Sequence, residues 1–203
     1  MIPLLLALAG LAALAPRAEW AVGARLGAGL AKLTPTATGR FPRTTALPAP
    51  SLAAEGRWAF HPVLDLRADL GLTLKGTGLS DHGHLAVWSG QGGLALAAHL
   101  GRPTWPVRPW LAVGPYLARR LATTGTWDGA PLAEPDAPFV AWDWGLTTAV
   151  GVDVDRWGQR WAVDLRLETG LADLANPAWP PFAEGQTMRQ QALSLGLGWR
   201  WGL

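Results

Sequence analysis

Hydrophobic and polar residues alternate along much of the chain, most clearly in LDLRADLGLTLK, residues 64–75. Leucine or alanine occupies each even position from 64 to 74, while Asp, Arg, Gly, Thr and Lys occupy the odd positions. Because successive side chains of a β-strand point to opposite faces, this period of two predicts a strand with one apolar and one polar face. The pattern alone leaves open which face meets water.

Segments with the same alternation recur along the chain, and we predict about eight strands. They cover residues 19–33, 51–61, 63–75, 84–100, 108–121, 139–155, 161–173 and 188–203. Strands of globular proteins average five or six residues, whereas a tilted strand of 9 to 11 residues crosses a bilayer. Most of the predicted segments reach that length, which favours a membrane.

The links between the predicted strands alternate between long and short. Long or polar links follow the first, third, fifth and seventh strands, at 34–50, 76–83, 122–138 and 174–187. Short links follow the second, fourth and sixth, at 61–62, 101–107 and 156–160. Outer-membrane barrels have short periplasmic turns and longer external loops. The alternation therefore predicts an all-β, eight-stranded antiparallel up-and-down transmembrane β-barrel with both ends on the periplasmic side.

Charged residues gather on one face of the predicted strands. The set contains seven acidic and six basic residues: Arg25, Glu55, Arg57, Asp65, Arg67, Asp69, Lys75, Asp143, Asp153, Asp164, Arg166, Glu168 and Arg200. A soluble barrel would have to enclose roughly forty apolar side chains, yet an eight-stranded interior is only just wide enough for side chains to fill. With the faces reversed, apolar side chains meet lipid and the charges pair across a polar lumen. We therefore predict a luminal charge network.

The fifth predicted strand, RPWLAVGPYLARRL, has an ambiguous pattern. We favour the arrangement in which Leu111, Val113 and Leu117 face outward.

Tryptophans, of which the chain has 13, fall near the ends of the predicted strands. Those near the periplasmic rim are Trp20, Trp58, Trp110, Trp157, Trp161, Trp199 and Trp201, and those near the external rim are Trp88, Trp142 and Trp144. Indole prefers the membrane interface because its body is apolar and its N–H seeks a wet partner. We predict two aromatic girdles; the alternative is that a common residue falls at strand ends by chance.

The composition restricts the classes of function. Charged residues make up 16% of the chain, below the roughly 25% of a typical soluble domain. The absence of cysteine excludes a disulfide framework and a thiolate metal site. A net charge of +2 with scattered arginines argues against nucleic acid as a partner.

The first eighteen residues form a separate segment. An apolar run from Ile2 to Leu14 is too short to cross a bilayer as a helix but suits the central region of a secretory leader. We predict a signal peptide over 1–18 and a barrel over 19–203; a buried N-terminal helix is the alternative.

The last segment, QALSLGLGWRWGL, alternates to the end of the chain. Here the sequence resembles the small eight-stranded outer-membrane barrels typified by OmpX and the OmpA transmembrane domain. The resemblance covers nearly the whole mature chain as a pattern and implies an outer-membrane location. In those families the barrel assembly machinery reads a final strand that ends in an aromatic residue, whereas this chain ends in Leu203 with Trp201 two places earlier.

Two charge triplets could carry chemistry. Asp65, Arg67 and Asp69 share one strand face, and 164–168 repeats the pattern. They could form a selectivity filter or a carboxylate pair for acid–base work. We favour a salt-bridged plug, because an unpaired buried ion costs several kcal/mol.

Histidines raise the question of a metal or catalytic site. SDHGH, residues 80–84, combines a hydroxyl, a carboxylate and two imidazoles, and His99 with Ser194 could serve a lipid hydrolase. No third ligand at fixed spacing and no nucleophile elbow accompanies them. We therefore predict no catalytic, cofactor-binding or metal-binding residue.

The predicted function is structural or surface-interactive, through four external loops in which Trp127, Trp179 and Phe182 are candidate contacts. The alternative for these aromatic residues is that they fold over the barrel mouth or rest on lipid headgroups. Expected partners are outer-membrane lipid, the barrel assembly machinery and a possible extracellular ligand, with the barrel a monomer. The alternatives are a lipid-modifying hydrolase, a narrow pore or ligand conduit, and a soluble periplasmic barrel.

Overall fold

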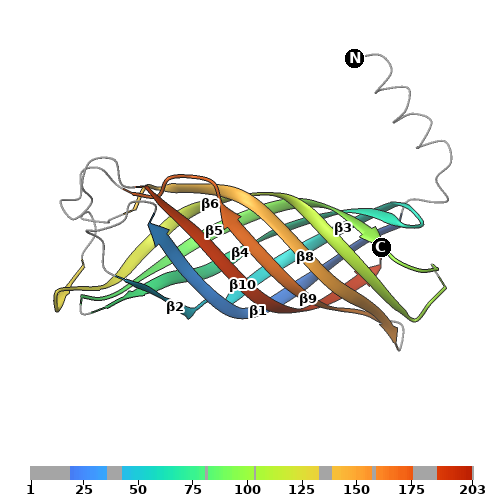
Figure 1. Ribbon diagram of the computed structural model, residues 1–203. Coiled ribbons are helices and arrows are strands. Elements are labelled where there is room, and N and C mark those ends of the chain that lie inside the picture. The colour runs from blue at the N-terminus through green and yellow to red at the C-terminus, as the bar shows by residue number, and fades with distance from the viewer. Residues whose placement is uncertain are drawn as a thin grey trace, which may run out of the picture.

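The computed structural model describes residues 19–35, 43–80, 82–102, 104–132, 139–156, 159–175 and 187–202. Figure 1 shows its strands winding diagonally around one barrel wall. The strands are β1 (Glu19–Pro35), β2 (Thr44–Pro48), β3 (Ser51–His61), β4 (Leu64–Leu79), β5 (Gly83–His99), β6 (Val107–Trp127), β7 (Ala130–Pro131), β8 (Trp142–Arg156), β9 (Gln159–Gly170) and β10 (Met188–Gly202). No helix in the described part of the chain is long and apolar enough to cross a membrane. The predicted leader, 1–18, lies outside the described residues.

The sheet closes on itself, because β10 pairs with β1 from Ala21↔Gly202 to Pro35↔Met188. All neighbouring strands are antiparallel, β2 and β3 together fill one position between β1 and β4, and β7 only extends a hairpin with β6. The predicted eight-stranded antiparallel up-and-down barrel is confirmed. The pairing of β1 with β10 removes the open edge that either strand would otherwise present to hydrocarbon, where unpaired backbone groups are costly.

The second wall strand starts earlier than the sequence predicts. It was expected over 51–61 after a long link from 34 to 50, yet β2 already belongs to the wall. The break between β2 and β3 contains Ala49 and Pro50, and the ladder continues across it through Ala49 N–H to Gly29 O (2.8 Å) and Leu74 N–H to Pro50 O (3.0 Å). Prolines have no N–H and are typical of turns, so this stretch looks like a loop in the sequence.

The orientation of the alternating residues in 64–75 is now clear. Leu70 is 71% exposed on the outer face, whereas Asp65 and Arg67 are buried inside. The fifth wall strand follows the favoured arrangement, with Leu111, Val113 and Leu117 outward. Exposed leucines and valines therefore form a continuous apolar belt around the wall, which is the surface that a bilayer requires.

Candidate functional site: a filled lumen

We name the two ends of the lumen by the predicted orientation, in which the rim that carries Glu19 and Gly202 is periplasmic. The periplasmic half contains a cluster centred on Asp65, which is fully buried. Its carboxylate accepts hydrogen bonds from Arg57 Nε (2.5 Å) and Arg67 Nε (2.9 Å). His99 Nε2 lies 2.5 Å from the same carboxylate, at the end of β5. Neighbouring strands supply these residues, so the antiparallel register alone brings them together.

A second acid completes this cluster from the opposite wall. Asp153 of β8 accepts from Arg67 Nη2 (3.3 Å) and Arg200 Nη1 (3.0 Å). Arg200 Nε also donates to Glu55 at 3.1 Å. The cluster therefore balances three carboxylates against three guanidiniums.

Two further ion pairs lie in the middle of the lumen, one spanning β10 and one joining opposite parts of the wall. Arg25 of β1 binds Asp164 of β9 through two hydrogen bonds, Nε–Oδ2 at 3.0 Å and Nη2–Oδ1 at 2.7 Å. Arg166 Nη1 donates to Asp69 at 3.2 Å. The Arg25 side chain lies over Gly196, where a Cβ would meet its Nη2 at 2.3 Å. The glycine of β10 therefore provides the space that this bidentate pair occupies.

The external half holds a smaller polar group around Lys75. Lys75 Nζ donates to Gln91 and contacts Glu168, each at 2.7 Å, and Gln91 Nε2 donates to Glu168 at 2.8 Å. The Tyr116 hydroxyl donates to Asp143 at 2.9 Å, and Lys75 Nζ lies 4.8 Å from the Tyr116 ring centroid. All thirteen charged residues of the predicted set thus have side chains on the inner face of the wall.

Above the polar layers, an apolar cluster closes the external end of the lumen. It consists of Leu33, Leu79, Leu85, Phe139, Ala172, Leu174, Ala175 and Met188. Leu85 and Met188 are fully buried. Sequence reasoning missed this cluster because it assigned apolar residues to lipid. The two-residue period of the strands could have revealed this cluster. Leu33 lies on the same strand face as Arg25, and Leu85 lies on the same strand face as Gln91.

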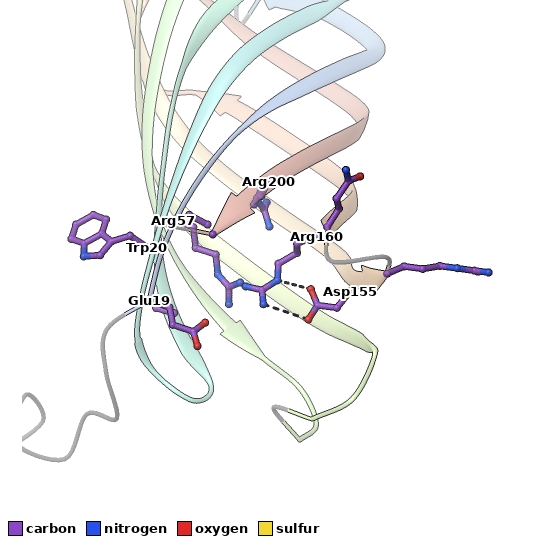
Figure 2. Close-up of a pocket in the computed structure, with 11 residues that line it drawn as sticks. Glu19, Trp20, Arg57, Asp155, Arg160 and Arg200 are labelled. Carbon is purple, nitrogen blue, oxygen red and sulfur yellow. Dashed lines mark hydrogen bonds and ion pairs between the residues drawn. The ribbon is translucent and has the colours of Figure 1, made fainter.

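Three cavities among the described luminal side chains are small. Their volumes are about 20, 30 and 30 Å³. A cavity of this size holds one or two water molecules. The larger space, about 540 Å³, is a vestibule open at the periplasmic mouth. Figure 2 shows its lining, including Arg57, Arg200 and the Arg160 side chain bound to Asp155 at 2.6 Å.

The predicted location of one tryptophan, Trp110, at the membrane interface is wrong. Trp110 is only 3% exposed and lies inside the lumen, with the Arg67 guanidinium 3.7 Å from its ring centroid. Successive side chains of a strand point to opposite faces, so Trp110 points into the lumen because its neighbour Leu111 lies on the outer face. Gly151 makes room for the ring, since a Cβ there would lie 2.5 Å from Trp110 Cζ2.

The other predicted interface tryptophans face outward in two groups. On the periplasmic rim, Trp20 stacks on Trp58 (centroids 5.5 Å apart) and Trp161 stacks on Trp199 (5.8 Å), which contacts Trp201 (4.2 Å). On the external rim, Trp88, Trp142 and Trp144 are exposed on β5 and β8. Each group covers only part of the circumference. Trp157 lies outside the described residues.

The histidine candidates separate in space. His99 belongs to the Asp65 cluster, whereas Ser194 lines a different cavity beside Lys75 and Glu168. His82 contacts Asp128 through Nδ1 and stacks on Trp127, with centroids 5.4 Å apart, which joins two external loops. Within the described ranges no three His, Asp or Glu side chains form a group that could hold a metal ion. Trp179 and Phe182 lie outside those ranges.

No protein-family model and no curated protein sequence matches the chain. Solved structures match at low identity over almost the whole length. Neisserial surface protein A is 16% identical, with 88% of this chain and 97% of that chain covered and a TM-score of 0.53. OprG from Pseudomonas aeruginosa is 14% identical (91% and 96% covered, TM-score 0.54). AlkL, an outer membrane protein, is 15% identical (93% and 92%, TM-score 0.53).

The likeness concerns the fold, and the outer surface is consistent with it. A closed wall with an apolar belt cannot remain in water, and these neighbours are barrels of the Gram-negative outer membrane. The chain has the fold of the small outer-membrane barrels and is an integral outer-membrane β-barrel protein.

Proposed function

We propose that the protein is a closed, non-enzymatic barrel that acts through its external loops and does not conduct. The observation that carries this proposal is the filling of the lumen. Ion pairs occupy its periplasmic and central parts, and the apolar cluster around Leu85 covers its external end. Ions that enter the vestibule would have to displace bound guanidiniums and then pass a desolvating apolar layer.

The arrangement of the polar side chains supports a role other than catalysis. His99 is held by Asp65 and faces Arg57 and Arg67, which leaves its Nε2 engaged within the plug. The remaining luminal carboxylates contact guanidinium, amide, ammonium or phenol groups. This is the arrangement expected of side chains that stabilise a barrel interior.

The external loops offer the surface for a partner. Trp127 and Asp128 of the β6–β7 hairpin contact His82 of the β4–β5 turn, so two loops form one unit at the external end. An extracellular ligand would bind this loop surface.

We further propose that the leader, residues 1–18, directs export of the chain. The barrel assembly machinery would recognise β10, and the assembled barrel would be a monomer.

Planar-bilayer recording tests the closed lumen. The purified barrel should produce no stable conductance steps under conditions in which an inserted porin does. Insertion is checked separately by co-sedimentation with liposomes and by faster migration of the unheated protein on gels. Reproducible steps from folded, inserted protein would contradict the proposal and favour a narrow pore. A deacylated lipid product, seen by mass spectrometry and lost on His99→Ala, would instead favour the hydrolase.

A further inference from the structure

The external end of the outer wall has two chemically different sides. On β5 and β8 it presents Trp88, Trp142 and Trp144, the interface residues described above. At the β1–β10 seam, on the opposite part of the strand order, it presents Lys32 and Arg189. The seam therefore meets the external membrane surface with two cations and no tryptophan among its described residues.

The register places these two cations close together on one face. Lys32 lies opposite Gln191, and Thr34 lies opposite Arg189, all with the outward parity of Leu30 and Leu193. Diagonal neighbours on one face of an antiparallel pair are about 7 Å apart, within reach of long side chains. Lys32 and Arg189 can therefore converge on a single small anion, with the Gln191 amide and the Thr34 hydroxyl as further donors.

The height of this group matches the lipid headgroups. The apolar outward positions of β1 run from Trp20 to Leu30. At a rise of ~3.3 Å per residue and a tilt of ~45°, that length corresponds to roughly 23 Å, close to the ~25 Å apolar band of such barrels. Lys32 is the next outward residue, so it lies where acyl chains end and headgroups begin.

Both positive charges are uncompensated within the described structure. No ion pair or hydrogen bond joins Lys32 or the Arg189 side chain to another described residue. Asp173, in the link between β9 and β10, accepts from the backbone N–H groups of Ala175 (3.1 Å) and Met188 (2.9 Å). An arginine and a lysine at one point are suited to a phosphate, through charge-assisted hydrogen bonds.

We propose that Lys32, Thr34, Arg189 and Gln191 form a binding site for the phosphate of a phosphorylated lipid in the external leaflet. The leucines directly below favour a lipid over free phosphate, because the acyl chains of the same molecule lie along Leu30 and Leu193 while its headgroup meets the cations. The site faces the membrane, so it is independent of the lumen and of the loop surface.

Native mass spectrometry tests the site with full-length barrel folded in detergent. The probe is a bisphosphorylated glycolipid of the lipid A type, compared with the same lipid after removal of its phosphates. Wild type should retain one phosphorylated lipid preferentially. Because a basic residue near a membrane surface contributes about 1 kcal/mol, Lys32→Gln and Arg189→Gln should each weaken retention about fivefold, and the double variant by more than tenfold.

Arg119→Gln is the matched control. Arg119 is also exposed at the external rim, but it lies over Trp142 on the other side, 5.7 Å from the ring centroid. It should retain the lipid like wild type, and all variants should keep the gel migration of the folded barrel. Equal retention by the double variant, or an equal loss in Arg119→Gln, would overturn the proposal. Complete displacement of the lipid by excess inorganic phosphate would also overturn it, because the site would then bind free phosphate.

Discussion

The guanidinium carbon of Arg67 lies 3.7 Å from the centroid of the Trp110 ring, inside the barrel. Asp65 and Asp153 bind the same guanidinium from two strands, so the indole provides the third side of its environment. A cation over an indole face is attracted by the ring quadrupole, more strongly where water is excluded. The periplasmic cluster thus combines ion pairs with one aromatic wall.

Replacing that wall should destabilise the barrel. Trp110→Ala removes the cation–π contact and leaves a cavity beside a buried charge, and we expect a loss of about 3–5 kcal/mol in the free energy of unfolding. Urea titration of the protein in lipid vesicles measures it. The outward Trp88→Ala should cost less, because lipid fills the vacated space. Equal losses in the two variants would contradict the inward position of Trp110.

The Arg25–Asp164 pair gives a test of charge burial. Asp164→Leu alone leaves Arg25 buried without its carboxylate and should cost about 3–5 kcal/mol, whereas the double change Arg25→Met with Asp164→Leu should be close to neutral. A double-mutant cycle from urea unfolding separates the coupling from the single effects. If the double variant is as unstable as the sum of the singles, the two residues do not act as a pair.

Gly196 should be sensitive to a single methyl group. A Cβ at this position would overlap the Arg25 guanidinium, so Gly196→Ala should weaken the pair and destabilise the wild-type barrel. In the background without Arg25 and Asp164 the same change should have little effect. Gly56→Ala is the control, because a Cβ there meets nothing within 4 Å. Thermal unfolding, followed by the loss of the compact gel band, compares the variants.

The apolar belt predicts a dependence on depth. Leu70 is 71% exposed near the middle of β4, so Leu70→Arg should destabilise the inserted barrel by about 2–4 kcal/mol. Leu100→Arg, at the periplasmic rim, should cost about 0–1 kcal/mol because the charge reaches water. Unfolding from vesicles measures both. Similar costs at the two positions would argue against a membrane around this belt.

The local alternation of apolar and polar residues, together with the lengths of the links, was sufficient to predict the eight-stranded barrel wall. They could not reveal β2, because Pro48 and Pro50 resemble turn residues although the ladder continues around them. Strict use of parity would have placed Trp110, Leu33 and Leu85 inside. The pairing of Arg25 with Asp164, 139 residues apart, depends on the register of β1, β10 and β9, which the sequence pattern does not define.

Methyl NMR with a lipid-borne spin label measures directly, in the unmodified chain, which side chains meet hydrocarbon. A doxyl group deep in the acyl region should broaden the methyl signals of Leu26, Leu70, Leu195 and Leu197, which are exposed on the outer face. It should spare Leu85 and Ala97, which are fully buried. Broadening of Leu85 together with sharp signals from Leu70 and Leu195 would contradict the outward orientation of the belt leucines.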